Sequence, residues 1–188
     1  MGTRFAHGLC LGCALLLGAA WPVLAETVRP AAAGSQLQQN TLSGVEQEHF
    51  LQEIQRHYPR RTPRQALLAH CNHLLESNAL RAGYLDTRLG SRVAEDQVYS
   101  LGVVNPGELT VRLDSRSEDG RRMQISARRV ALYGVDPFVR YRCPPGGPSC
   151  TVLNPFDGSD LLVMVRDRKA VAELAQTLSF LIRDLQKD

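Results

Sequence analysis

The residues of this sequence that are best suited to chemistry are His70, Cys71 and His73. A cysteine thiolate beside a histidine base can act as a nucleophile, and two histidines three positions apart on a helix can bind one metal ion. No third ligand lies close by in the sequence, so His70 and His73 are weak metal candidates, and we expect no metal and no other cofactor. Leucines at helical spacing around Cys71 favour a buried thiol in a packed helix.

Arginines form a second group of candidate binding residues. Several lie between residues 55 and 64, where the sequence contains no acidic residue, and two more alternate along a predicted strand. These residues are Arg56, Arg60, Arg61 and Arg64 in the first group and Arg140 and Arg142 in the second. A local positive patch can bind an acidic protein surface or anionic lipid headgroups. Peripheral membrane contact through Arg56–Arg64 is therefore one interpretation, and a solvated corner between two helices is the other.

Cys143 and Cys150 flank a loop that consists only of proline, glycine and serine. Apolar residues on both sides predict two strands joined by this loop, and we expect a disulfide between the two cysteines. In the chain-entropy model a loop this short contributes about 2–3 kcal/mol to stability. Because surface loops often make contacts, the residues of this loop are further binding candidates: Pro144, Pro145, Gly146, Gly147 and Pro148.

The first residues have the pattern of an export signal, in which Arg4 precedes an apolar run that ends in small residues before Ala25. We expect signal peptidase to cut after Ala25, which places the protein in the periplasm or outside the cell. Both compartments permit disulfides. Residues 26–43 have no periodicity and predict a flexible tether. Residues 44–188 are long enough for a single domain with its own core.

The charge balance argues against nucleic acid as a partner. The formal net charge is +3 for the whole chain and becomes +2 when the predicted signal, whose only charge is Arg4, is removed. A nearly neutral domain lacks the concentrated positive charge that binds phosphate backbones. We therefore expect a protein or another envelope component as the partner, and the sequence leaves the oligomeric state open.

Hydrophobic periodicity predicts helices at both ends of the domain. The spacing of apolar residues predicts one helix over about residues 44–58 and a second over about residues 63–77. A third helix is predicted near the C-terminus, where apolar residues between 171 and 185 recur every three or four positions. Residue types favoured at helix starts precede or open two of these helices. They are Thr62 and Pro63 for the second helix and Asp167 for the third.

Alternation of apolar and polar residues predicts about six strands between the second and third helices. In one of them the alternation that starts at Met123 and Ile125 breaks at Arg128 and resumes in the opposite phase at Val130. This break predicts a β-bulge, because without one half of the strand would present its apolar residues to water. Residues 161–165 are apolar at every position, which is typical of a strand covered on both faces.

The element order predicts an α+β domain. It would contain two N-terminal helices, an antiparallel and strongly bent sheet of about six strands, and a C-terminal amphipathic helix packed on that sheet. From about Asp96 to Asp188 this order resembles the pleckstrin-homology-type architecture. The resemblance is one of layout and implies no function.

Because the sequence contains no catalytic motif, our leading hypothesis is a non-catalytic exported protein. It would bind another protein or an envelope component as an accessory, inhibitor or immunity-type module. The alternative hypothesis is an envelope hydrolase or metal-dependent enzyme that uses His70, Cys71 and His73.

Overall fold

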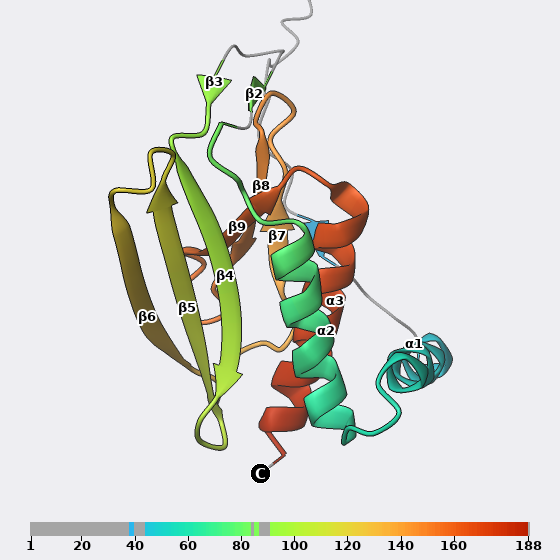
Figure 1. The fold of residues 1–188 in the computed structure, drawn as a ribbon. Coiled ribbons are helices and arrows are strands. Elements are labelled where there is room, and N and C mark those ends of the chain that lie inside the picture. The colour runs from blue at the N-terminus through green and yellow to red at the C-terminus, as the bar shows by residue number, and fades with distance from the viewer. Residues whose placement is uncertain (1–37, 40–43, 84, 87–90, 188) are drawn as a thin grey trace, which may run out of the picture. The chain divides into compact units, whose positions relative to one another are not determined.

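The computed structural model describes residues 38–39, 44–83, 85–86 and 91–187 (Figure 1). The predicted signal peptide and most of the predicted tether lie outside these residues. The exception is β1 (Gln38–Gln39), a short strand that pairs antiparallel with Arg140 and Tyr141. Three helices, two larger antiparallel sheets and one short strand pair make up the described part, which confirms the α+β class.

The helices begin and end close to the predicted positions. They are α1 (Gly44–His57), α2 (Pro63–Ser77) and α3 (Arg168–Leu185). At the start of α2, the backbone N–H of Gln65 donates to the Thr62 side chain, and the backbone N–H of Thr62 donates to the Gln65 side chain. This capping box satisfies two backbone donors at once. The Asp167 carboxylate accepts from two backbone N–H groups in the first turn of α3, so local residues define both helix starts.

The predicted strands are divided between two sheets rather than joined in one. The first sheet contains β4 (Glu95–Val103), β5 (Glu108–Ser117) and β6 (Met123–Ala131), in that order. The second contains β1, β7 (Arg140–Arg142), β8 (Ser149–Leu153) and β9 (Asp160–Val165). The short strands β2 (Leu85–Asp86) and β3 (Ser91–Arg92) pair with each other. The expectation of a single bent sheet is corrected accordingly.

The chain leaves the first sheet after β6 because residues 132–139 pack against α3. Leu132 and Val139 are both buried. The Gln186 side chain, at the end of α3, donates to the carbonyl of Leu132 at 2.7 Å. The backbone N–H of Val139 donates to the hydroxyl of Ser179 at 2.9 Å. These contacts hold the connection on the helix, so β7 starts a second sheet instead of pairing with β6.

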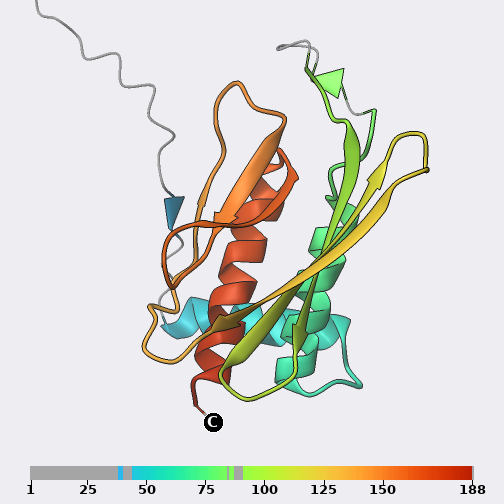
Figure 2. The same ribbon diagram turned by 90° about the vertical axis from the view of Figure 1, so that its left-hand side faces the viewer.

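Each sheet is covered by its own helix (Figures 1 and 2). Helix α2 packs against β4, α3 packs against β7 and β8, and the two helices pack against each other. The inward stripe of α3 supplies much of the core, with Val171, Leu174, Leu178, Leu181, Ile182 and Leu185 fully buried. Among the described residues, no helix combines the length and the apolar composition needed to cross a membrane.

The predicted β-bulge in β6 is wrong. Strand β6 pairs with β5 without interruption along its whole length. The strand therefore keeps one phase, and its early apolar residues lie on the outer face of the sheet. Met123 is 65% exposed and Ile125 is 51% exposed, whereas Val130 faces the core and is only 4% exposed. The break at Arg128 thus marks a change of face in the apolar pattern rather than an extra residue.

Candidate functional site

The structure separates the three residues of the histidine–cysteine cluster. The ring of His70 contacts the carboxylate of Glu173 on α3, with 2.7 Å between Nε2 and Oε1. His73 is exposed, and Cys71 is fully buried against the core. Within the described part of the chain, no third histidine, cysteine or acid completes a metal-binding group with these residues. The contact between His70 and Glu173 joins α2 to α3.

Cys71 is expected to resist alkylation in the folded protein. Burial raises the pKa of its thiol well above the ordinary value, and the thiolate is the form that reacts. At about pH 8, iodoacetamide should leave Cys71 of the unreduced native protein unmodified and should label it only after denaturation, as mass spectrometry can show. Rapid labelling of the native protein would contradict the burial and would support an enzyme centred on Cys71.

The arginines of the cluster between α1 and α2 also differ in their contacts. Arg64 bonds to Asp184 of α3, with 2.7 Å between Nε and Oδ2. The guanidinium of Arg61 lies over the ring of Tyr58, 5.9 Å from its centroid. Only Arg56 and Arg60 are exposed without a contact of this kind that the structure describes. The cluster therefore contributes partly to holding the helices together.

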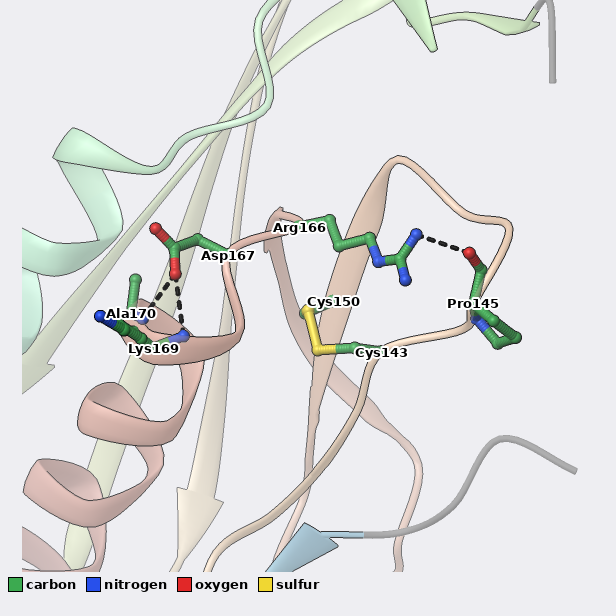
Figure 3. Close-up of a disulfide and its surroundings, with 7 residues drawn as sticks. All are labelled: Cys143, Pro145, Cys150, Arg166, Asp167, Lys169 and Ala170. Carbon is green, nitrogen blue, oxygen red and sulfur yellow. Dashed lines mark hydrogen bonds between the residues drawn. A yellow bond between two sulfur atoms is a disulfide. The ribbon is translucent and has the colours of Figure 1, made fainter. Parts of the chain in front are cut away.

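The sulfur atoms of Cys143 and Cys150 lie at disulfide distance, 1.94 Å apart (Figure 3). The loop between them is held to the start of α3 rather than projecting freely. Arg166 donates from its side chain to the carbonyl of Pro145 at 2.6 Å and from its backbone to the carbonyl of Pro148 at 2.9 Å. Of the five predicted contact residues in this loop, only Pro145 is exposed. This anchoring leaves the loop less surface for a partner than its sequence suggests.

The two arginines of β7 have different surroundings. Arg140 is exposed. Arg142 donates to the carboxylate of Asp160 on the same sheet at 2.5 Å. The structure therefore does not bring these arginines together with the cluster between α1 and α2 into one described site.

Strand β6 is the most exposed regular element that the structure describes. It is the outer strand of its sheet, on the side away from the helices (Figure 1). All of its residues except Val130 are exposed. Natural edge strands are usually short, bulged or covered, because an open edge can pair with another chain. A long, unbulged edge with Met123 and Ile125 exposed beside it is therefore unusual.

Two hydrogen bonds show which backbone groups of β6 face β5. The N–H of Ser117 donates to the carbonyl of Arg122 at 2.9 Å, and the N–H of Leu132 donates to the carbonyl of Gly107 at 2.8 Å. Backbone groups along an antiparallel strand point alternately to its two sides. Even-numbered residues therefore face β5, and odd-numbered residues face outward, where no strand of the described residues pairs with them. The outward groups belong to Met123, Ile125, Ala127, Arg129 and Ala131.

A small hollow opens beside this edge on the inner face of the sheet. Its volume is about 130 Å³, and it is lined by Tyr99, Val111, Leu113, Ser126, Ala127 and Arg128. Leu113 lies between Tyr99 and Ser126 in one row across the three strands. Leu113 is only partly buried, and its neighbour toward the edge, Ser126, has a small side chain.

Arg128 forms one wall of the hollow and is fixed in place. Its guanidinium donates to the carbonyl of Asp160 at 2.6 Å and to the carbonyl of Leu161, both in β9. Burial raises the pKa of Tyr99, and the positive charge of Arg128 partly opposes this shift. Tyr99 therefore stays a neutral phenol at neutral pH, and the hollow combines an apolar floor with one fixed positive charge.

The chain matches no protein-family model, no curated protein and no solved structure. The resemblance to the pleckstrin-homology-type layout therefore rests on element order alone.

Sequence reasoning missed β6 as a binding surface. It selected arginines and the Pro/Gly loop, whose residues are partly occupied by contacts within the protein. The signal that marks β6 was present at Arg128, where the apolar alternation changes phase. Interpreted as exposure instead of a bulge, that break would have placed Met123 and Ile125 on the surface.

Proposed function

We propose that this is an exported, non-catalytic protein that acts by binding another protein in the periplasm or outside the cell. An accessory, inhibitor or immunity-type role is consistent with this proposal. The observation that carries it is the open edge of β6, which offers five outward residues whose backbone pairs with no described strand, beside two exposed apolar side chains. The export pattern at the N-terminus and the Cys143–Cys150 disulfide support the compartment.

Strand addition explains how such an edge would bind. An extended segment of the partner can pair with the outward N–H and C=O groups, and side chains beside the edge then supply specificity. Met123 and Ile125 would lose water contact in the same step, which favours association. An edge of this length also fits the ordinary length of a paired strand. These features fit protein recognition better than the dispersed candidates for chemistry do.

The experiment that tests this function is affinity capture from an envelope extract with matched variants. One variant, Ala127→Pro, removes an outward backbone donor, and a second, M123S/I125S, removes the apolar side chains. The control V104S/F156S removes two other exposed apolar side chains, which are 69% and 71% exposed.

The wild type and the control should recover the same protein, and both β6 variants should lose it. The proposal fails if no protein is recovered at all. It fails equally if all four proteins recover the same protein in equal amounts.

A further inference from the structure

We infer that the segment that adds to β6 is an extended strand with acidic residues at both ends and a large apolar side chain at its centre. This inference rests on the proposed function and specifies the chemistry of the partner.

Charge complementarity is the first reason. Residues 121–131 contain the arginines Arg121, Arg122, Arg128 and Arg129 and no acidic residue. The acids of this sheet lie in β4 (Glu95, Asp96) and β5 (Glu108, Asp114), and Glu118 and Asp119 lie in the turn before β6. The positive charges therefore bracket the apolar middle of β6 at both of its ends. A partner strand with acids at its two ends would match this pattern.

The arginines are also available to a partner. The side chains of Arg121, Arg122 and Arg129 are 88%, 78% and 70% exposed. The acids nearest Arg121 and Arg122 are Asp119 and Glu95, 3.8 and 3.7 Å away at the surface, whereas Arg129 lies 3.4 Å from Glu108, whose facing oxygen is buried. Exposed ion pairs of this kind are weak. A partner carboxylate can therefore compete with the pairs of Arg121 and Arg122 at little cost.

Like-charge repulsion disfavours a second copy of this chain in one of the two registers that stack its apolar side chains. Outward backbone groups belong to odd-numbered residues, so an antiparallel pairing of two β6 strands must set odd residues opposite odd residues. Two such registers stack the apolar side chains: one is centred on Ile125, and the other, centred on Gln124, sets Met123 opposite Ile125 and no arginine opposite another. In the register centred on Ile125, Arg121 lies opposite Arg129, and Arg122 lies opposite Arg128, on both sides of the symmetry axis. Like charges directly opposite across two strands are destabilising, and Arg128 is held by β9.

The hollow beside Ser126 is the reason for the central apolar side chain. A residue of the added strand level with Ser126 would place its side chain on the inner face, with the small Ser126 between it and Leu113. A long or aromatic side chain at this position can extend past Ser126 and contact Leu113. The volume of about 130 Å³ equals roughly four water molecules of liquid, which one large apolar side chain can displace.

Synthetic peptides test this inference directly. The first probe is a capped peptide with two glutamates at each end and Thr-Val-Phe-Val-Thr between them. The second probe replaces the glutamates by lysines, and the third replaces the central Phe by Ala. Binding is measured by fluorescence anisotropy, and its location is measured from the backbone amide NMR signals of the protein. The glutamate peptide should bind and shift the signals of Ile125 and Ala127, and the other two should bind at least about tenfold more weakly.

Matched charge variants complete the test. The triple variant R121Q/R122Q/R129Q should weaken binding of the glutamate peptide by about tenfold. The control R56Q/R60Q/R61Q loses the same number of charges at a different surface and should bind as the wild type does. Equal binding of the glutamate and lysine peptides, or equal loss in both triple variants, overturns the inference. A concentration-dependent dimer that Ala127→Pro dissociates would assign the edge to a second copy and would also overturn it.

The two proposals fail in different ways. If capture from the envelope extract depends on β6 but the glutamate peptide is not preferred, only the chemistry of the partner is wrong. If capture does not depend on β6, the proposed function is wrong whatever the peptides show.

Discussion

Replacing Gln124 by proline is expected to destabilise the protein by about 1–3 kcal/mol, whereas replacing Ala127 by proline should change its stability by less than about 0.5 kcal/mol. Both side chains are exposed and both positions lie in β6. They differ in the direction of the backbone. The N–H of Gln124 faces β5, so proline removes a ladder hydrogen bond and leaves its acceptor without a partner. The N–H of Ala127 faces the free edge, where it bonds only to water.

Urea unfolding followed by circular dichroism gives the comparison, because a shift of the midpoint at constant slope reports stability alone. The two substitutions serve as controls for each other, since each introduces the same ring into the same strand. Equal destabilisation would contradict the assignment of odd-numbered residues to the open edge. So would the reverse order, in which Ala127→Pro is the more damaging change.

Replacing Leu178 by alanine is expected to have the larger effect, about 2–5 kcal/mol of lost stability. Leu178 is fully buried in the stripe of α3, which packs against α2 and the second sheet. The substitution removes apolar contacts and leaves a cavity that the surrounding helices cannot close completely. In a domain of this size each kcal/mol lowers the melting temperature by roughly 2–4 °C, so differential scanning calorimetry should show a large shift.

The matched control for Leu178→Ala is Phe156→Ala. Phe156 is 71% exposed, and removing an exposed ring should change stability by less than about 0.5 kcal/mol. If Leu178→Ala were no more destabilising than Phe156→Ala, α3 would not be the centre of the core.

The helices could be predicted from the sequence because their determinants are local. Thr62 and Pro63 lie beside the turn that they start, and the apolar stripe of α3 repeats within one segment. The disulfide was predictable for the same reason, since Cys143 and Cys150 are only seven positions apart. Each of these features depends on residues that are close in the chain.

The division into two sheets could not be predicted, because contacts between distant residues cause it. The bond from Gln186 to Leu132 joins residues 54 positions apart. No local sequence pattern in residues 132–139 predicts that this connection packs on α3. The same limit applies to the arginine cluster, because Arg64 donates a hydrogen bond to Asp184, which lies 120 positions further along the chain.

The candidate binding edge at β6 could not be predicted from the sequence for a different reason. The alternation in β6 was read on the assumption that apolar residues face the core. At Met123 and Ile125 that assumption does not hold, because their outer face remains open to water. Departures from a local rule are often functional, and this departure coincides with the free edge of the sheet.

Residue-by-residue amide exchange of the protein, alone and bound to the captured partner, tests most directly whether β6 is the binding edge. In the free protein the amides of Ile125 and Ala127 should exchange fast and those of Gln124 and Arg128 slowly, because only the even-numbered residues bond to β5. In the complex Ile125 and Ala127 should become slow as well. Unchanged exchange along β6, with new protection confined to residues 144–149 or 56–64, would contradict binding at this edge.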